Sequence, residues 1–520
     1  MNLVLFKNGT TISIVHGSIL KVPFSLLLFQ DVAEPMRNFI QIFLILKAMK
    51  RSTIFLLILL GGLFFLTSCP GDEEDPLISE EIRMINTWIW EGMNEVYLWE
   101  EYLPDMDPDL QPDPEKFFYD LLYEEDRDSW IVDDYAALKE MFAGIQMTTG
   151  MSARPGLISD TRVISIVEYV TPGSPAADAG IKRGDIIHAI DGRSLTVDNY
   201  YDLYNQTTAT FDFATWDGSW FIPDGRSITL TAIKLNQNPV VYREVIEYEG
   251  KKIGYFVYTQ FTSGETGEWL EELNGVFEEF KTAGVTDVVM DLRYNPGGSL
   301  DLSAYIAGTL APFSAMSGKE VFVRLSWNDL YNDFWKEYDL DEDGEPDGDE
   351  SRQLLIRFPH SDLNMNLSRV FFLTTDVTAS ASESLITGLY PYTEVVHIGD
   401  TTYGKCYGST TIEDFEEPKR HSWAMQPIIL QYSNAEGFTG FVDGLAPDIM
   451  VRESLLYAKS FGSPNDPLLG AALEEITGVE VAAKKAALPE DAFRTLPVPA
   501  NQAVERMIRW PEEHPARIPN

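Results

Sequence analysis

Strand-like and helix-like segments alternate from about residue 241 to 475, and this alternation restricts the main part of the chain to a layered α/β fold. Residues 253–258 have the composition of a strand, and apolar residues at helical spacing follow over 269–280. Residues 288–290 form a second apolar run, typical of a buried strand, which leads into Asp291-Leu292-Arg293. The pattern therefore predicts one large core over residues 241–480.

The composition narrows the class of protein. The chain has 520 residues, with 81 acidic residues against 39 Lys and Arg, so its formal net charge is −42. This charge argues against nucleic acid and anionic membrane surfaces as partners. A hydrophobic content of 45% excludes a disordered chain. Two cysteines are too few for a disulfide framework or a structural zinc site. We expect a large, acidic protein of several domains.

The N-terminal residues have the pattern of an export signal. Lys50-Arg51 precedes an apolar stretch over 54–66, and Thr67-Ser68-Cys69 closes it. The closing residues resemble a bacterial lipobox, which implies that Cys69 becomes the lipidated first residue of the mature chain. The alternative is an N-terminal transmembrane anchor. We expect residues 1–68 to be leader and signal peptide, with the true start at Met49, and residues 69–75 to be an acidic tether.

The export signal and the lipobox-like residues predict a location in the bacterial cell envelope. A lipid-anchored chain would be held at a membrane, which we expect to be the outer membrane, facing either the periplasm or the cell surface. The run Asp72-Glu73-Glu74-Asp75 resembles the acidic export signal of some surface lipoproteins and is also typical of a solvated tether.

Two short regions precede the large core. Ser79 before apolar residues at helical spacing, and Asp113-Pro114 before a second such stretch, predict a small helical domain over residues 76–130. Its aromatic residues are more typical of a core than of a ligand site. At the other end, the Pro-rich residues 481–520 predict a tail along the surface.

Residues 131–240 have a sequence pattern typical of short strands and turns. They contain Thr171-Pro172-Gly173-Ser174-Pro175, Lys182-Arg183-Gly184-Asp185 and the turn Asp191-Gly192. This ordered string resembles a PDZ domain of the bacterial protease type. Such domains bind peptide C-termini as an added strand, with the carboxylate on backbone N–H groups. The resemblance places the carboxylate loop at Thr149, Gly150 and Met151.

A serine that follows a β-rich run is the strongest candidate nucleophile. Residues 370–374 precede Ala379-Ser380-Ala381-Ser382-Glu383, and an apolar helical pattern follows. A serine at such a strand-to-helix junction lies at the positive end of the helix dipole, which stabilises developing negative charge. A serine needs a base, and Gly404-Lys405 follows the next predicted strand. A histidine base is harder to assemble, although His397 or His421 would be its candidates.

These segments together resemble the S41 family of C-terminal processing proteases. The resemblance rests on Ser380-Ala381-Ser382-Glu383, Gly404-Lys405, the turn Asn295-Pro296-Gly297-Gly298 and the late Gly444-Leu445-Ala446-Pro447. It implies an α+β multi-domain fold, in which a small N-terminal helical domain and a PDZ domain of β-sandwich type accompany a mixed β/α core of the ClpP–crotonase type. It also implies a serine endopeptidase that recognises the accessible C-terminal tails of proteins or peptides.

The resemblance implies roles for particular residues. Ser380 would be the nucleophile and Lys405 the general base, while Gly297 or Gly298 and Ala381 would supply the oxyanion hole. Because a free lysine is neutral in only about one molecule in 2,500 at pH 7, we expect Lys405 to be buried without a carboxylate in direct contact. Glu383 and Thr402 match further family positions and would support this geometry.

Some positions leave alternatives open. Many members of the family carry a Gln four residues after the lysine, where this chain has Ser409, so the hydroxyl of Ser409 or Thr402 would have to orient the amine. Ser382 and Ser384 are rival nucleophiles without the family spacing to Lys405. Cys406 has the position of a small packed side chain. The missing Gln also supports a rival function, that of a non-catalytic lipoprotein that only binds peptides.

One acidic segment has the spacing of a calcium-binding loop. The oxygen-bearing residues are Asp339, Asp341, Asp343, Glu345, Asp347 and Glu350, with Gly344 at the turn. Pro346 departs from the pattern, and flanking helices are not evident. The spacing predicts a structural calcium ion, while the predicted chemistry requires no cofactor.

Overall fold

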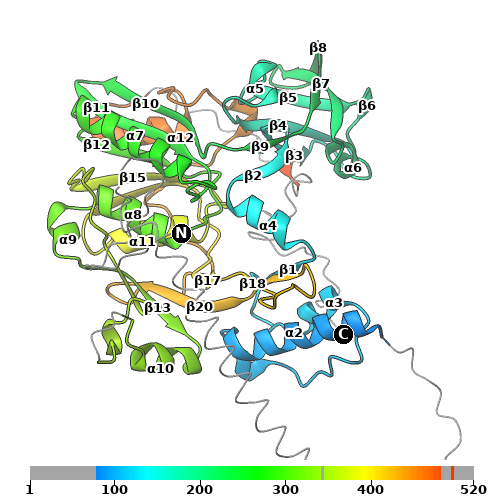
Figure 1. The fold of residues 1–520 in the computed structure, drawn as a ribbon. Coiled ribbons are helices and arrows are strands. Elements are labelled where there is room, and N and C mark those ends of the chain that lie inside the picture. Colours follow the sequence, from blue (N-terminus) through cyan, green and yellow to red (C-terminus); the bar gives the residue numbers. More distant parts are fainter. Residues whose placement is uncertain (1–77, 341–344, 482–492, 497–520) are drawn as a thin grey trace, which may run out of the picture. The chain divides into compact units, whose positions relative to one another are not determined.

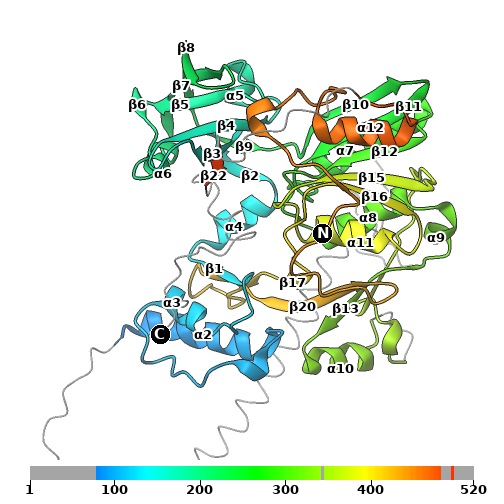
Figure 2. The ribbon, with the colours of Figure 1, turned by 180° about the vertical axis from the view of Figure 1, so that it is seen from behind.

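The computed structural model describes residues 78–340, 345–481 and 493–496 (Figures 1 and 2). The predicted leader, Cys69, the acidic tether, Asp341 and Asp343 lie outside these residues, as does most of the C-terminal tail. Residues 415–418 group apart from the other described residues, which form one compact unit. Within the described ranges, no helix is long and apolar enough to cross a membrane.

Short helices make up the first described region. Its elements are α2 (Glu80–Val96), η2 (Glu100–Tyr102), α3 (Pro114–Asp120), β1 (Trp130–Val132) and α4 (Tyr135–Phe142). The side chains of Ser79, Asp113 and Asp134 accept N–H groups in the first turns of α2, α3 and α4. Ser79 and Asp113 are the helix starts that the sequence predicts. The aromatic residues Phe117 and Phe118 are fully buried, as expected for core positions.

A seven-stranded antiparallel sheet forms the second region, in the order β22-β3-β4-β5-β7-β8 with β6 paired to β5. The elements of this region are β2 (Ile145–Thr148), β3 (Met151–Leu157), β4 (Val163–Val170), α5 (Pro175–Asp178), β5 (Ile186–Ile190), β6 (Arg193–Ser194), α6 (Tyr200–Tyr204), β7 (Thr208–Trp216), β8 (Phe221–Thr231), β9 (Ile233–Asn236) and β22 (Arg494–Thr495). Ser174 caps α5, and both Asp191 and Gly192 have the positive φ that a tight hairpin turn requires. The local turn chemistry therefore agrees with the sequence.

A six-stranded sheet, β10-β11-β12-β15-β16-β21, forms the centre of the third region. Its strands and helices are β10 (Val240–Tyr248), β11 (Lys251–Tyr258), α7 (Glu268–Ala283), β12 (Asp287–Asp291), α8 (Leu300–Leu310), α9 (Phe313–Ser317), β15 (Arg369–Thr374), α11 (Ala381–Leu389), β16 (Glu394–Gly399), β21 (Ile449–Met450), η4 (Leu455–Tyr457) and α12 (Pro467–Thr477). All strands from β11 to β21 are parallel, and only β10 is antiparallel.

Helices cover both faces of this sheet because adjacent residues of a strand point to opposite faces. Tyr255 lies in the apolar cluster with the buried leucines of α12, whereas the next residue, Phe256, packs edge-on against Phe277 of α7. Two smaller sheets, β14-β13-β20-β17 and β1-β19-β18, accompany it. Their remaining elements are β13 (Val321–Trp327), α10 (Asp329–Glu337), η3 (Gly348–Glu350), β14 (Leu355–Arg357), β17 (Tyr407–Ser409), β18 (Ile412–Glu413), β19 (Ala424–Gln426) and β20 (Ile428–Asn434).

The parallel order places three predicted motifs at one edge. The carboxyl ends of adjacent parallel strands meet at the same edge of a sheet. The Asn-Pro-Gly-Gly turn follows β12, Ser380 follows β15, and Lys405 follows β16, and these strands are neighbours in that order. The topology thus brings together segments that lie more than 100 residues apart in the chain.

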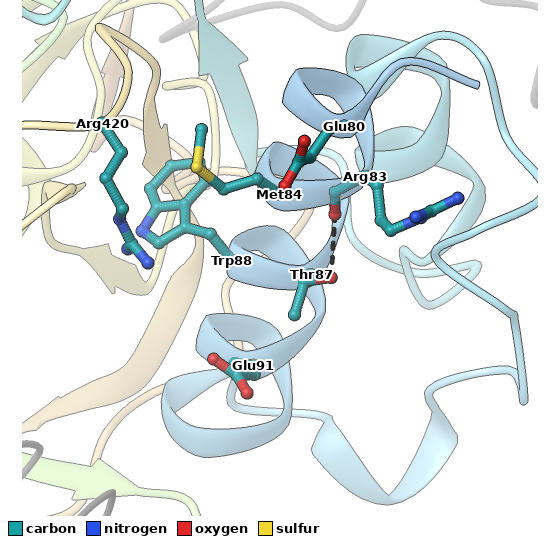
Figure 3. A pocket seen from close by; sticks show the side chains of 7 residues that line it. All are labelled: Glu80, Arg83, Met84, Thr87, Trp88, Glu91 and Arg420. Atoms are coloured by element: carbon teal, nitrogen blue, oxygen red, sulfur yellow. Dashed lines mark hydrogen bonds between the residues drawn. The ribbon is translucent and has the colours of Figure 1, made fainter.

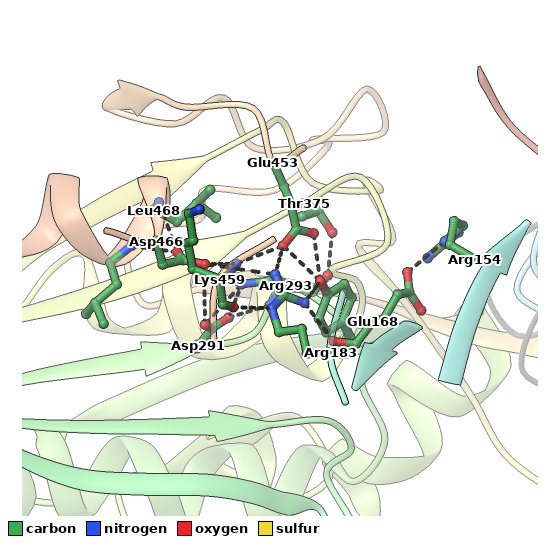
Figure 4. Close-up of polar contacts among 12 residues, drawn as sticks. Arg154, Glu168, Arg183, Asp291, Arg293, Thr375, Glu453, Lys459, Asp466 and Leu468 are labelled. Carbon is green, nitrogen blue, oxygen red and sulfur yellow. Dashed lines mark hydrogen bonds and ion pairs between the residues drawn. The ribbon is translucent and has the colours of Figure 1, made fainter. Parts of the chain in front are cut away.

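A buried ionic network joins the antiparallel sheet to this edge (Figure 4). Arg293, fully buried just after β12, pairs with Asp291 at 2.7 Å, Asp466 at 3.0 Å and Glu453 at 2.8 Å. Arg183, in the turn before β5, also pairs with Glu453 and donates to the hydroxyl of Tyr294 at 2.5 Å. Since Tyr294 directly precedes Asn295, the network fixes the predicted PDZ region against the Asn-Pro-Gly-Gly turn.

Glu453 is the residue through which this network can be tested. Burial alone would raise the pKa of Glu453, but the charges of Arg183 and Arg293 outweigh it and lower the pKa to about 2. The ordinary value is 4.5, so the ionised carboxylate stabilises the fold above pH 4.5, and this contribution is lost as the pH falls toward 2. We expect Glu453→Gln to reduce the free energy of unfolding by about 3 kcal/mol at pH 7, with the deficit shrinking between pH 4.5 and 2.

Denaturant unfolding at several pH values measures this difference. Glu272→Gln is the matched control, because Glu272 pairs with Arg243 at a side-chain exposure of 35% and should change the free energy by less than about 0.5 kcal/mol. A deficit for Glu453→Gln that stays constant from pH 7 to pH 2 would contradict the role given to its charge.

Candidate active site

Ser380 stands at the N-terminus of α11 in a strained conformation. Its φ is 56° and its ψ −115°, a region that costs a residue with a side chain about 1–3 kcal/mol. Its side chain is half-buried at the edge where β15 ends, whereas every residue of α11 itself is buried. Strain of this kind persists only where the surroundings hold it, and it commonly marks a functional residue.

Glu383 ties the segments of Ser380 and Lys405 together. One carboxylate oxygen of Glu383 accepts the backbone N–H groups of both Ser380 and Lys405, each at 2.8 Å. The other oxygen accepts the N–H of Gly404 at 2.7 Å and the hydroxyl of Thr402 at 2.5 Å. Burial raises the pKa of Glu383, and these four hydrogen bonds oppose the rise by stabilising the ionised form. Glu383 therefore joins the backbones of Ser380, Gly404 and Lys405 to the hydroxyl of Thr402, and the supporting role of Glu383 and Thr402 stays a prediction.

Tyr432 holds the same two residues through their carbonyl groups. Its buried hydroxyl lies 3.0 Å from the carbonyl oxygen of Ser380 and 2.7 Å from that of Lys405. The backbones of Ser380 and Lys405 are thus bridged by one atom through their N–H groups and by another through their carbonyls. Tyr432 lies on β20, and no motif in the sequence connects it to Ser380.

The side chain of Lys405 lies in the interior. Lys405 is 6% exposed, as expected, and no ion pair within 4.0 Å involves its amine in the part of the chain that the structure describes. One buried carboxylate, Asp128, interacts electrostatically with the charge of Lys405. Burial raises the pKa of Asp128, and the positive charge of Lys405 counteracts this rise. Asp128 is 2% exposed and accepts the hydroxyl of Tyr403 at 3.4 Å.

Arg127 fastens the loop that carries Lys405. Its Nη2 lies 2.7 Å from the carbonyl oxygen of Gly404, 2.6 Å from that of Val442 and 3.4 Å from that of Tyr403. Its guanidinium also stacks over the ring of Tyr403 at 4.8 Å. Arg127 and Asp128 come from the first described region, about 275 residues from the loop, and sequence reasoning missed both. An Arg-Asp pair in an acidic chain carries no local signal of such a contact.

The predicted oxyanion hole lies against Ser380. Gly297 and Gly298 have φ of 108° and 136°, which favour glycine, and a Cβ on Gly297 would come within 2.8 Å of the Cβ of Ser380. The N–H of Gly297 is already bound to the side chain of Asn295 at 2.8 Å. The described hydrogen bonds engage neither the N–H of Gly298 nor that of Ala381. Of the two glycines predicted, the geometry therefore favours Gly298 as the donor, and Gly297 supplies the close approach.

The rival nucleophiles and bases have structural partners. The hydroxyl of Ser382 donates to the carbonyl oxygen of Asn295, and that of Ser384 donates to the carbonyl oxygen of Ala381. His397 is buried in β16 against the hydroxyl of Thr374, and His421 packs edge-on against Trp88 of α2. Neither histidine forms a described hydrogen bond with Ser380, whereas Glu383 and Tyr432 each bind the backbones of both Ser380 and Lys405.

The remaining predicted residues have simpler surroundings. Ser409 is exposed on β17, and the hydroxyl of Thr402 is taken up by Glu383, so neither has a described hydrogen bond to the amine of Lys405. Cys406 is a buried free thiol, and the amide of Gln431 contacts its sulfur at 3.8 Å. The expected packing role of Cys406 agrees with this.

The predicted carboxylate loop lies between β2 and β3. Gly150 has a φ of 76°, and its N–H donates to the hydroxyl of Thr148 at 3.0 Å. The carbonyl of Thr149 accepts the N–H of Ala176 in α5, while Met151 begins β3. The binding role of these residues stays a prediction.

The calcium loop is only partly described. Glu350 pairs with Arg357, and Asp349 pairs with Lys336 at 3.3 Å, so two nearby cations already neutralise part of the acidic segment. The described residues contain no group of three or more His, Cys, Asp or Glu side chains that could hold a metal ion. Calcium binding stays a prediction.

A separate hollow of about 250 Å³ runs along α2 (Figure 3). Met84 and Trp88 lie on the side of Arg420, and Arg83 points away from it. The lining residues are Glu80, Arg83, Met84, Thr87, Trp88, Glu91 and Arg420. The hollow shares no residue with the Ser380 region and offers no nucleophile with a base.

Comparison with known proteins identifies three regions of the chain. Residues 84–134 match the model of the peptidase S41 N-terminal domain, 166–206 that of the PDZ domain and 252–451 that of peptidase family S41. The chain therefore carries a domain of peptidase family S41, together with the N-terminal domain of that family and a PDZ domain. It is a serine protease that carries a PDZ domain, and the predicted α+β multi-domain fold is confirmed.

Individual relatives have low sequence identity to this chain, and their matches cover between about half and four fifths of it. A carboxyl-terminal-processing protease from Synechocystis sp. is 24% identical over 67% of this chain and 75% of its own length. A chloroplastic carboxyl-terminal-processing peptidase from Arabidopsis thaliana is 29% identical over 46% of this chain and 41% of its own length. A solved structure from Bacteroides fragilis, assigned to the S41 proteases, superimposes with a TM-score of 0.61 and 26% identity, covering 80% of this chain and 99% of that one.

Arg127 provides a test of how the lysine loop is held. We expect Arg127→Met to lower kcat by about 10–100-fold with little change in KM, because the loop of Lys405 loses its hydrogen bonds from Arg127 at Tyr403 and Gly404, and with them its link to Val442, while the substrate contacts remain. Arg226→Met is the matched control, since Arg226 is also paired, with Asp185 and Asp224, but lies on β8. Steady-state kinetics with melting temperatures measure both variants. Equal kcat values for the two would show that Arg127 does not position the loop.

Proposed function

We propose that the chain hydrolyses peptide bonds with Ser380 as nucleophile and Lys405 as general base. The observation that carries this assignment is the double bridge through Glu383 and Tyr432, which holds the backbones of the two residues together. Lys405 accepts the proton of the Ser380 hydroxyl as its oxygen attacks the substrate carbonyl. The amine that leaves takes this proton, and a water molecule activated by Lys405 then hydrolyses the acyl-enzyme.

The negative charge of the tetrahedral intermediate needs hydrogen-bond donors. The N–H groups of Gly298 and Ala381 are the candidates, because Ala381 follows Ser380 in the chain, Gly298 follows the glycine that lies against Ser380, and neither N–H is engaged by the described part of the chain. Ala381 also begins α11, whose positive end favours an anion there. This donor pair supports acyl transfer rather than simple peptide binding.

We infer that the PDZ domain selects substrates by their C-terminal tails. The relatives from Synechocystis and Arabidopsis are named carboxyl-terminal-processing proteases. In this chain the loop of Thr149, Gly150 and Met151 leads into β3, where a strand-paired tail would end, and Gly150 has the positive φ of a tight turn. Protein or peptide chains with accessible C-termini are therefore the proposed substrates.

Substitution of Lys405 tests the dyad most sharply. Arginine keeps the positive charge and most of the volume but is not deprotonated in proteins, so we expect Lys405→Arg to lose activity by about 10³-fold or more, as should Lys405→Ala and Ser380→Ala. Lys336→Arg, at an exposed ion pair with Asp349, is the control and should retain full activity. The assay follows cleavage of an unfolded substrate with an apolar C-terminus. Substantial activity in Lys405→Arg would exclude this lysine as the base.

We also propose that the mature chain is lipid-anchored through Cys69 in the bacterial cell envelope, at the outer membrane. The support lies in the sequence, where an apolar stretch ends at Cys69 and an acidic segment follows. Expressed with its full precursor, the protein should fractionate with membranes, and Cys69→Ala should release it or leave it unprocessed. Peptide mapping should find no peptide from residues 1–48. Recovery of such peptides from the mature protein would contradict the anchor.

The proposed hydrolysis requires no metal or organic cofactor. A structural calcium ion at the loop from Asp339 to Glu350 is a separate proposal that rests on ligand spacing alone. The ion pairs of Glu350 and Asp349 with Arg357 and Lys336 would compete with the ion for these carboxylates.

A further inference from the structure

A short segment of the C-terminal tail forms the outermost strand of the PDZ sheet. β22 pairs antiparallel with β3, with Arg494 opposite Leu157 and Thr495 opposite Gly156. The N–H of Leu496 continues this ladder by donating to the carbonyl of Pro155 at 2.8 Å. Figure 2 shows β22 beside β3, on the side away from β4. The edge of β3 that does not pair with β4 is therefore covered by residues from the same chain.

The direction of this segment is that of a bound peptide. As the tail runs from Arg494 to Leu496, its partners run backward along β3 from Leu157 to Pro155, toward Met151. The predicted carboxylate loop lies just beyond that end of β3. A peptide that adds to a sheet edge by strand pairing, with its C-terminus at this loop, would take the same edge and the same direction.

Side chains anchor the segment on both faces of the sheet. Leu496 packs on the apolar core that contains Leu203, against which Tyr200 and Tyr204 of α6 also pack. Phe493 packs on the opposite cluster, which includes Ile164 and Ile166 of β4. Between these two anchors, Arg494 and Thr495 are exposed.

Gly156 makes room for the aromatic anchor. A Cβ at this position would lie 2.3 Å from Cε2 of Phe493, so any side chain on Gly156 would displace the ring. The edge of β3 thus combines a backbone ladder with an apolar site on each face. It fits an extended segment that has an aromatic residue three positions before an aliphatic one.

We propose that residues 493–496 are an intramolecular ligand of the PDZ domain, and that a substrate tail must displace them from the edge of β3. This inference rests on the proposed use of the PDZ domain for tail recognition and adds how that site is regulated. A tethered segment competes at an effective concentration in the millimolar range, so it suppresses weak substrates and admits those that pair with β3 more strongly. The chain then discriminates among tails before Ser380 is reached.

The test uses the full chain with Ser380→Ala, so that bound peptide is not cleaved. The probe is a fluorescent peptide with the sequence of residues 489–500, and anisotropy measures its dissociation constant. We expect the double variant Phe493→Ala, Leu496→Ala to bind the probe at least about tenfold more tightly than the parent, because the competing segment is weakened. Arg494→Ala is the matched control in the same strand and should bind as the parent does.

Hydrogen exchange gives a second measurement that does not depend on the probe. In the double variant, the amides of Gly156 and Leu157 should exchange faster than in the parent, because β22 no longer covers this edge. Tighter binding together with faster exchange supports the proposal. Unchanged affinity, unchanged exchange, or failure of both proteins to bind the probe overturns it.

Failure of the proposed chemistry would look different. If the double variant binds the probe more tightly but the chain with an intact Ser380 cleaves no substrate, the regulation stands and the Ser380–Lys405 assignment falls. If cleavage depends on Ser380 and Lys405 while the tail variants change neither binding nor exchange, the chemistry stands and the intramolecular ligand falls.

Discussion

One buried carboxylate holds the active site together. Glu383 accepts hydrogen bonds from the backbones of Ser380, Gly404 and Lys405, although the first and last of these are 25 positions apart in the chain. An uncharged side chain such as glutamine could not accept all of them, because its amide nitrogen is a donor. Leaving these backbone donors unpaired in the interior would cost about 1–3 kcal/mol each. The strained φ of Ser380 persists because Glu383 on one side and Tyr432 on the other fix its backbone.

The chain is strongly acidic, but most of the carboxylates described near the site have partners other than the amine of Lys405. The net charge of the chain is −42, so carboxylates are abundant. A carboxylate in direct contact with a lysine favours the charged form of its amine. The carboxylate of Glu383 binds the backbone N–H of Lys405, and the buried Asp128 is the acidic side chain whose charge interacts with that of the lysine. The carboxylates Asp291, Asp466 and Glu453 are held by Arg293, beyond the Asn-Pro-Gly-Gly turn. Glu383, Asp291, Asp466 and Glu453 therefore bind backbone N–H groups or arginine, and Asp128 is left as the acidic neighbour of Lys405.

Local signals in the sequence predict most of the fold. Ser79, Asp113 and Ser174 cap helices where expected, and the alternation over residues 241–475 predicts the α/β layering of the core, although not the order of its strands. The same signals place Ser380, Lys405 and the glycine turn after adjacent parallel strands, so their meeting at one edge could be anticipated. Ser409 shows the limit of carrying over a family position, because it lies exposed on β17.

The contacts that escaped prediction all join distant segments. Arg127 and Asp128 reach the lysine loop across about 275 positions, and Tyr432 reaches Ser380 across 52. No spacing or composition in the sequence identifies these contacts. Many arginines and tyrosines could make them, and only the packed structure shows which one does. Arg183 differs in this respect. Its turn is predictable as part of the PDZ domain, but its partners Glu453 and Tyr294 belong to the protease core.

The pairing of β22 with β3 follows from a constraint that any peptide-binding sheet faces. A strand edge kept open for substrates exposes unpaired N–H and carbonyl groups, and such an edge also attracts unrelated strands. Most proteins cover an edge permanently, which would abolish binding. A short strand with two apolar anchors covers the edge of β3 and contributes few hydrogen bonds, so a longer or better matched tail can replace it. Under the proposed use of this edge for substrate tails, the weakness of a two-residue strand would let one surface serve both protection and recognition.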